Sequence, residues 1–285
     1  MTGVLYIVAT PIGNLDDISL RAIAILKTVD LIAAEDTRHS RQLLNHLGID
    51  ARLLSCHEHN ENSRSIELLQ KLADGSDIAL ISDAGTPLIS DPGYRLVSAA
   101  LRQGIRVSPI PGANSAIAAL SAAGLPTEKF HFAGFLSAKS LERAAQLRAL
   151  VDMPATLVLF ESGRRIERLL AQVEEIFPAC PCVVAKELTK LHERFLHGNA
   201  AQLLQQFAQD PKLKKGEFVF LIDNTAAGAE RAIDAEDLHL LKILLDEVSV
   251  KMAVNIAVRL TGKKKNEIYQ QALSLCAVRE SNSEI

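Results

Sequence analysis

Residues 80–93, LISDAGTPLISDPG, hold the residue types that most clearly indicate a binding site. The pattern Ser-Asp-x-Gly occurs twice in them, directly after an apolar run. Gly85 and Gly93 permit backbone conformations forbidden to other residues, so a ligand can lie close to main-chain amides. Asp83 and Asp91 add acceptor oxygens, which suit hydroxyl groups, amino groups or cations and disfavour a bare phosphate. Turn hydrogen bonds alone are the alternative role for both aspartates, but at Asp83, at the strand terminus, the binding role is favoured.

A second cluster, EDTRHS, follows another apolar run and places Glu35, Asp36, Arg38 and His39 close together. Such a cluster can supply a general base, an ion pair that orients it, and a cation for a phosphate group. The alternative is a helix N-terminus whose acidic groups are stabilised by the helix dipole.

Two later segments, FESGRR and KELTKLHERF, also place charged residues after predicted strands. Taken singly, these residues are expected to form surface salt bridges. The residues are Glu161, Arg164, Lys186, Glu187, Lys190, His192 and Glu193.

Several common sites are excluded by their missing motifs. The loop ATPIGNLDD has one glycine and an early proline, so it is not a G-x-G-x-x-G dinucleotide fingerprint. The chain also has no G-x-x-x-x-G-K-[ST] loop and no G-x-S-x-G elbow. Its four cysteines have neither zinc nor CxxC spacing, so we expect reduced thiols and no metal.

The elements that position these loops form strand-helix-strand units in the first third of the chain. Short apolar runs predict strands, and apolar residues at helical spacing predict the helices between them. Since ligands bind at the carboxyl ends of the strands in an open parallel sheet, the loops above should meet in one crevice. The predicted strands are Val4–Ala9, Leu31–Ala34, Arg52–Ser55, Ile78–Ser82 and Val107–Ile110, and the predicted helices cover about residues 18–29, 38–47, 63–73, 93–103 and 113–123.

A second α/β unit and a helical extension follow. Strands are predicted at 155–160, 182–185 and 218–222, and helices at 140–150, 164–176 and 199–209. Beyond a linker, residues 235–276 read as helices around a turn at Gly262, either a packing hairpin or a helix-turn-helix. The sequence thus predicts an α/β protein with domains at 1–120 and 121–228 and a helical extension at 233–285 that is a possible RNA contact.

Composition limits the partners. The chain has 285 residues, 48% hydrophobic content and a net charge of -3, as expected of a globular protein rather than a strongly basic one. Basic residues do cluster, at Arg164, Arg165 and Arg168, at Lys212, Lys214 and Lys215, and at Arg259, Lys263, Lys264 and Lys265. No basic n-region or long apolar run is present, so neither secretion nor membrane insertion is expected, and a cytoplasmic location is predicted.

The loops together resemble a known family. SDAGTPLISDPG, ATPIGNLDDISLRA, AAEDTRHSRQLL, PIPGANSAIAALSAAGLP, FES and KELTKLHE are similar to the tetrapyrrole methylase superfamily (class III methyltransferases), and more narrowly to its branch of cytidine 2'-O-methyltransferases. The resemblance implies two α/β domains with S-adenosylmethionine between them and a homodimer. It also implies a target ribose in the decoding region of small-subunit (16S) ribosomal RNA, free or in an assembled subunit. The loop TPIGN lacks the glycine-rich sequence of many porphyrin-modifying relatives, which disfavours a tetrapyrrole substrate.

The resemblance also assigns residues to the methyl-donor site. They are Pro11, Ser82, Asp83, Ala84, Gly85, Ile89, Ser115, Ala116, Phe160, Glu187, Leu188 and Phe218. A sulfonium donor with a ribose, an amino group and an adenine carries no phosphate, which agrees with the polar ligand inferred from the loop alone.

The chemistry requires alignment and removal of a proton from a ribose hydroxyl. Alignment can contribute on the order of 7 to 11 kcal/mol, and a general base about 10²- to 10⁴-fold. The hypothesis places Asp36 or Glu35 near the hydroxyl, Arg38 on the adjacent phosphate, and Lys186 as a second candidate base. The alternatives are a methyltransferase acting on a small molecule such as a tetrapyrrole, favoured by the low aromatic content, and a non-catalytic RNA-binding assembly factor.

Overall fold

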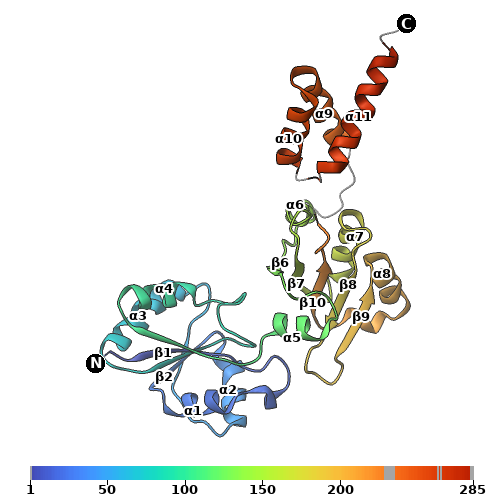
Figure 1. Cartoon of the computed structure of the whole chain (residues 1–285). Helices are drawn as coiled ribbons and strands as arrows, with labels where there is room; N and C mark the ends of the chain where they lie inside the picture. The colour runs from blue at the N-terminus through green and yellow to red at the C-terminus, as the bar shows by residue number, and fades with distance from the viewer. Residues whose placement is uncertain (1, 228–234, 262, 264, 283–285) are drawn as a thin grey trace.

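The computed structural model describes residues 2–227, 235–261, 263 and 265–282. In chain order these residues form a lobe around a first sheet, a lobe around a second sheet, and three C-terminal helices that extend away from the first lobe (Figure 1). The predicted fold class, two α/β units and a helical extension, is confirmed.

The first sheet is fully parallel, with the strand order β3-β2-β4-β1-β5. It matches the five predicted strands to within one residue at each end. The central strands β2 and β4 are continuous apolar runs because both faces are covered: α1 and α2 pack on one face and α3 and α4 on the other. The elements are β1 (Val4–Val8), α1 (Leu20–Thr28), β2 (Leu31–Ala34), α2 (Thr37–His46), β3 (Leu53–Ser55), α3 (Glu61–Ala73), β4 (Ile78–Ile81), α4 (Tyr94–Arg102) and β5 (Arg106–Ile110), with a short 3-10 helix η1 (Leu15–Asp17).

The connections diverge between β2 and β4, which are neighbours in the sheet. The chain leaves β2 through α2 on one face and leaves β4 through α4 on the other. Such a switch point opens a crevice at the carboxyl ends of the two strands. The EDTRHS and SDAGTPLISDPG loops both begin at this crevice.

The second sheet is mixed, with the order β6-β7-β10-β8-β9, and only β6 and β7 pair in parallel. Helices α6, α7 and α8 cover one face, and α5 packs on the other. The elements are α5 (Ser115–Ala122), β6 (Phe130–Phe135), α6 (Ser140–Arg148), β7 (Thr156–Ser162), α7 (Ile166–Ile176), β8 (Cys182–Lys186), β9 (Arg194–Gly198), α8 (Ala200–Gln209), β10 (Glu217–Asp223) and the 3-10 helix η2 (Pro211–Lys214).

The two edge strands of this sheet, β6 and β9, are not predicted by the sequence. β6 contains a register shift between Phe132 and Gly134, which interrupts the alternation of apolar and polar residues. β9 has the sequence RFLHG, with two exposed basic residues, and reads as a polar loop. Because β10 runs antiparallel to β7 and β8, its beginning and not its end lies beside their carboxyl ends.

The C-terminal helices α9 (Ala235–Glu247), α10 (Val250–Thr261) and α11 (Lys265–Asn282) pack around a small core of their own. Ala253, Val254 and Ala257 are buried on the predicted face of α10. On α11 Ile268 is buried, whereas Tyr269 and Leu273 are 44% and 41% exposed.

The predicted domain boundaries stay predictions. The one after residue 120 falls within α5, which packs on the second sheet. Residues 228 and 233, the predicted turn residue Gly262, and Lys264 of the basic cluster lie outside the described residues.

Candidate active site

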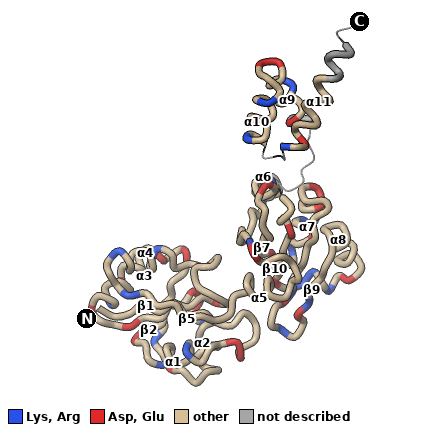
Figure 2. Tube along the Cα trace, in the orientation of Figure 1, with Lys and Arg blue, Asp and Glu red and all other residues tan. Residues whose placement is uncertain are grey.

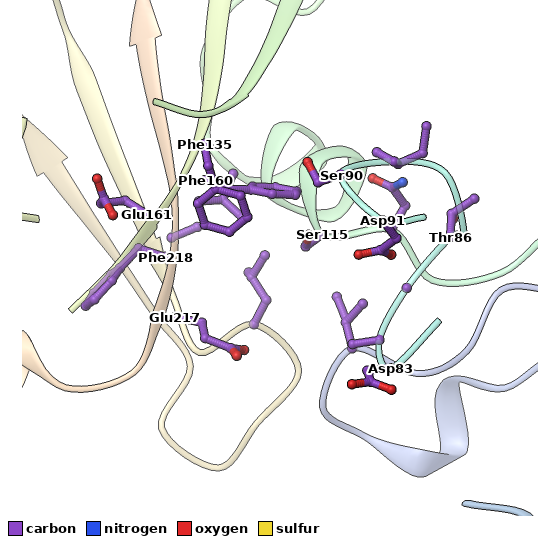
Figure 3. Close-up of a pocket in the computed structure, with 18 of the residues that line it drawn as sticks. Asp83, Thr86, Ser90, Asp91, Ser115, Phe135, Phe160, Glu161, Glu217 and Phe218 are labelled. Carbon is purple, nitrogen blue, oxygen red and sulfur yellow. The ribbon is translucent and has the colours of Figure 1, made fainter. Parts of the chain in front are cut away.

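A cavity of about 380 Å³ lies between the two lobes, where the carboxyl ends of the first sheet face one end of the second (Figure 3). This volume is within the range of small-molecule sites. The first-lobe loops and the start of α5 contribute Ile12, Glu35, Asp83, Ala84, Gly85, Thr86, Ile89, Ser90, Asp91, Asn114 and Ser115. The second lobe contributes Phe135, Phe160, Glu161, Ser162, Ala185, Leu188, Lys190, Glu217, Phe218 and Val219.

The turn after β4 is tied to the loop after β1. Thr10 N donates to Gly85 O (2.8 Å), and Gly85 N donates to Thr10 O (3.0 Å). Gly85 has φ +80°, and a Cβ there would lie 3.3 Å from the Ile12 side chain. The Thr10 hydroxyl also donates to Ser82 O (3.1 Å). These bonds fix a main-chain wall of the cavity that only glycine forms without strain.

The second half of the same loop stores backbone strain. Leu88 and Ser90 adopt φ values of +73° and +72°, which cost side-chain-bearing residues on the order of 1 to 2 kcal/mol each. The Thr86 hydroxyl anchors the loop by donating to Ala113 O (3.0 Å). The strained turn directs Ile89 and Asp91 to the cavity, and such strain typically accumulates at functional sites.

Three carboxylates converge at the switch point between β2 and β4. Glu35, Asp83 and Asp91 all line the cavity, and Asp83 Oδ1 accepts a hydrogen bond from Asp36 N (3.0 Å). Burial, reinforced by the charge of Asp83, raises the pKa of Glu35. Burial also raises the pKa of Asp91 to about 6, with Glu35 and Asp83 adding to the effect. The site therefore favours cations, hydroxyl groups or a transferable proton.

Asp36 and Arg38 stand outside this group. The Asp36 carboxylate caps α2 by accepting from Arg38 N (2.8 Å), and it also binds the Arg38 guanidinium (3.2 Å). Hydrogen bonds from Arg38 lower the pKa of Asp36. The Arg38 side chain is 91% exposed, and neither residue lines the cavity. Asp36 and Arg38 therefore have the geometry of a capped helix N-terminus, the alternative role considered for the EDTRHS cluster.

The second lobe supplies an apolar wall. Phe160 packs edge-to-face against Phe132 and Phe135, with ring centroids 4.8 and 5.5 Å apart. Figure 3 shows Phe135 and Phe160 at one side of the cavity, opposite Asp83 and Asp91. At the start of α5, Asn114 caps the helix by accepting from Ile117 N (3.2 Å). Flat apolar rings opposite polar loops suit a ligand with an aromatic base and a polar tail.

The loop after β8 closes the cavity against the first lobe. Asn14 N donates to the Thr189 hydroxyl (3.0 Å), and a Cβ on Gly13 would lie 2.5 Å from the Lys190 side chain. Glu187 adopts φ +50°, and its Oε1 accepts from Glu217 N (2.9 Å) and Lys190 Nζ (3.2 Å). The Glu187 carboxylate thus shapes this turn and does not line the cavity.

Lys186 lies on the opposite face of the second sheet from Ala185, which lines the cavity. The Lys186 residue is 7% exposed, and its Nζ lies 5.9 Å from the centroid of the Phe218 ring. Phe218 pairs with both Lys186 and Glu161 across the sheet. On this side the Arg165 Nε binds Glu161 Oε1 (2.6 Å).

The structure thus brings most of the predicted site residues together. Those that line the cavity are Glu35, Asp83, Ala84, Gly85, Ile89, Ser115, Phe160, Leu188 and Phe218. Those that do not are Pro11, Ser82, Ala116, Glu187, Asp36, Arg38 and Lys186; Pro11, Ser82 and Ala116 are buried next to lining residues.

Other lining residues were not assigned to the site from the sequence. Ile12, Thr86, Ser90 and Asn114 lie inside quoted loops, so extending each assignment along its loop would have found them. Phe135 and Glu217 lie at strand ends whose direction the sequence does not reveal.

Within the part of the chain that the structure describes, no three His, Cys, Asp or Glu side chains form a group that could hold a metal ion. Over the same residues, no helix is both long and apolar enough to cross a membrane.

Comparisons with known proteins identify relatives of the whole chain. Residues 4–204 match the family model of Tetrapyrrole (Corrin/Porphyrin) Methylases, and residues 231–275 match a model described as RsmI C-terminal HTH domain. "Ribosomal RNA small subunit methyltransferase I" of Pseudomonas aeruginosa is 48% identical over 95% of this chain and 97% of that protein. The protein of the same name from Escherichia coli O157:H7 is 47% identical over 95% of each chain.

Solved structures share the fold at lower identity. A diphthine synthase aligns with a TM-score of 0.62 and 17% identity, over 77% of this chain and 89% of that one. A uroporphyrin-III-C-methyltransferase from Thermus thermophilus aligns with a TM-score of 0.56 and 21% identity, over 79% of this chain and 96% of that one.

Proposed function

The chain belongs to the tetrapyrrole methylase family and, within it, to the ribosomal RNA small subunit methyltransferase I group, and we propose that it methylates the 2'-hydroxyl of a cytidine ribose in 16S ribosomal RNA with S-adenosylmethionine as donor. The chain is a methyltransferase. The observation that carries the proposal is the interlobe cavity, in which a main-chain turn and three carboxylates face an apolar wall.

The donor fits this cavity by chemistry. Gly85 lets a ligand approach the backbone, and Phe160 with Leu188 offers an apolar surface for an adenine ring. Asp83 and Asp91 can accept hydrogen bonds from hydroxyl and amino groups and attract a sulfonium charge. Five acidic residues and one lysine line the cavity, which disfavours a ligand with phosphate groups.

Bound S-adenosylmethionine supplies an electrophilic methyl group on a positively charged sulfur. During transfer the carbon–sulfur bond breaks with its electrons returning to sulfur, and a carbon–oxygen bond forms to the ribose. Glu35 and Asp91 both line the cavity and are the proposed acceptors of the hydroxyl proton, because their raised pKa values make them better proton acceptors than an ordinary carboxylate. We therefore keep Glu35 as the candidate base and add Asp91; Asp36, Arg38 and Lys186 would act only after a rearrangement.

The C-terminal helices are proposed to contact the RNA. The start of α11 exposes Lys265, Asn266 and Tyr269, which can bind phosphate, base edges and a base face. A chain that ends after residue 227 should keep its donor affinity and bind the acceptor more weakly. Equal activity of the two chains on the acceptor would contradict this role.

A homodimer in the cytoplasm is proposed as well. On the α5 side of the second sheet, Ile117, Phe130 and Phe135 are 52%, 46% and 58% exposed. A second copy of the chain would cover this apolar surface. Sedimentation of the wild type against Phe130→Glu tests it: the wild type should be a dimer and the variant a monomer.

The function is tested by incubating the protein with radiolabelled donor and small ribosomal subunits that lack the modification. Label should enter the 16S RNA, and nuclease digestion with mass spectrometry should locate it on one cytidine ribose. Free RNA in parallel shows which acceptor form is used. Label on a base, label on protein, or no incorporated label would refute the proposal, and transfer to a tetrapyrrole instead would identify a small-molecule enzyme.

A further inference from the structure

A second hollow, a groove of about 400 Å³, lies between α3 and α4 on the outer surface of the first lobe. None of the residues that line it is acidic, and two are arginines. They are Asn62, Ser65, Ile66, Leu69, Tyr94, Arg95, Ser98, Ala99 and Arg102. Neither the comparisons nor the active site accounts for it.

The end of the groove near the active site is held rigidly. The Glu61 carboxylate at the start of α3 is 7% exposed and accepts from Gly93 N (3.1 Å) and Arg95 N (2.9 Å) at the start of α4. A buried carboxylate on the free N–H groups of a helix N-terminus stabilises that terminus. The two helices therefore present their first turns in a fixed relation.

The groove also contains an unsatisfied polar group. Ser65 is 6% exposed, and its hydroxyl makes no hydrogen bond. A buried hydroxyl usually has a partner, so Ser65 marks a polar position in the otherwise apolar floor of the groove.

Its arginines are available for anions. Arg95 donates to the Asn62 side chain, and Arg102 Nη1 donates to Ser98 Oγ (3.1 Å). Both partners are neutral, and among the residues that the structure describes neither guanidinium forms an ion pair with a carboxylate. Residues 95 and 102 are seven positions apart on one helix, about 10 Å along its axis. Figure 2 shows Lys and Arg segments on α3 and α4.

The rim carries an exposed aromatic ring. Tyr94 is 73% exposed and Ile66 is 71% exposed. Tyr94 follows Asp91, which lines the active-site cavity, by three residues. The first turn of α4, at one end of the groove, therefore continues directly from the loop that lines the cavity.

We propose that the α3–α4 groove is a docking surface for the RNA strand next to the target nucleotide. Arg95 and Arg102 bind its phosphates, and Tyr94 stacks on an unpaired base. The proposal rests on the proposed function and names a second contact for the same substrate. The acidic cavity repels phosphates while admitting one ribose, so the flanking backbone must be held elsewhere, and the groove supplies the opposite charge.

RNA is favoured over a protein partner by the distribution of charge. Lys and Arg contacts to phosphates position a nucleic acid, and aromatic rings stack on its splayed bases. Binding of an acidic peptide would use the two arginines but would leave the exposed Tyr94 ring without a role. A stable interface with a second copy of this chain would need a larger apolar surface than the groove offers.

The probes are small ribosomal subunits that lack the modification and a fluorescein-labelled single-stranded RNA of their decoding region. The variants are Tyr94→Ala and the double variant Arg95→Ala with Arg102→Ala. Arg21→Ala is the matched control, since Arg21 is exposed on α1, on the opposite face of the first sheet. Donor affinity, measured by calorimetry, verifies that each variant is folded.

We expect the double variant to bind RNA about 10-fold more weakly and to lower the slope of log affinity against log salt concentration by about 1.4, the value for two phosphate contacts on a single strand. Tyr94→Ala should weaken binding at least about 5-fold with little change in slope. KM for RNA should rise while kcat at saturating RNA is kept, and Arg21→Ala should behave as wild type.

If both variants bind RNA with the wild-type affinity and salt dependence, the α3–α4 groove is not an RNA-docking surface. The proposed function would still stand, provided that the wild-type protein methylates the RNA. A changed oligomeric state with unchanged RNA binding would also overturn RNA docking in the groove, in favour of a second copy of the chain. If wild-type protein neither binds nor methylates the RNA, the proposed function itself fails.

Discussion

Replacing Asp91 with asparagine should stabilise the folded protein above pH 6. Burial and the charges of Glu35 and Asp83 raise the pKa of Asp91 from 3.8 to about 6. The folded chain therefore binds this proton more tightly than the unfolded chain, and stability falls as the pH rises from about 4 to about 6. Above that window the ionised carboxylate imposes its full cost, which an amide does not.

The cost follows from the pKa. A rise from 3.8 to about 6 corresponds to about 3 kcal/mol. Because the side chain is only partly buried, solvent screening reduces this to about 1 to 2 kcal/mol. For an unfolding unit of about 150 to 250 residues, the melting temperature of Asp91→Asn should exceed that of the wild type by about 2 to 8 °C at pH 8, and by clearly less at pH 4.5.

Thermal unfolding followed by circular dichroism at both pH values measures this difference. Asp36→Asn is the control, because hydrogen bonds from Arg38 lower the pKa of Asp36 and its substitution should not stabilise the protein at pH 8. An equal shift at both pH values, or none at pH 8, would show that Asp91 is not held in a destabilised ionised form. If Asp91→Asn is more stable but no longer transfers methyl groups, the ionised Asp91 carboxylate lowers stability but is needed for activity.

Three further predictions concern the cavity walls. Gly13→Ala should lower donor affinity, measured by calorimetry, because its Cβ would lie 2.5 Å from Lys190 and separate the lobes; unchanged affinity would mean that the contact is not needed. Glu35→Gln should lower the single-turnover rate of methyl transfer about 10²-fold without changing donor affinity. A wild-type rate would show that Glu35 does not accept the proton. Phe160→Ala should lower the free energies of unfolding and of donor binding by about 3 to 5 kcal/mol together. Denaturation measures the first and calorimetric titration the second, and no change in either would contradict the role of Phe160 in the cavity wall.

The first lobe is predictable because its signals are local. The runs that form β2 and β4 are continuous and apolar, as strands buried on both faces must be. Each strand ends at a loop that contains acidic residues or glycine. The rule that ligands bind at the carboxyl ends of parallel strands then places Asp83 and Glu35 together from sequence alone.

The second lobe is less predictable because its geometry depends on distant pairings. The antiparallel direction of β10 decides that Glu217 and Phe218 begin at the cavity, and no local pattern encodes that direction. Lys186 shows a related difficulty: it shares a sheet face with Phe218, which lines the cavity, yet it does not line the cavity itself, and the strand pattern does not distinguish the two. Asp36 shows the remaining difficulty: a carboxylate before a helix has the same sequence signature as a cap and as a base.

The central claim is that one cavity between the lobes binds the methyl donor, and a calorimetric titration of the purified chain with S-adenosylmethionine and its demethylated product tests it most directly. We predict one site per chain, with affinity reduced at least tenfold by Gly85→Val on the first-lobe wall and by Phe160→Ala on the second. No binding by the wild type, or binding that neither substitution weakens, would contradict the account.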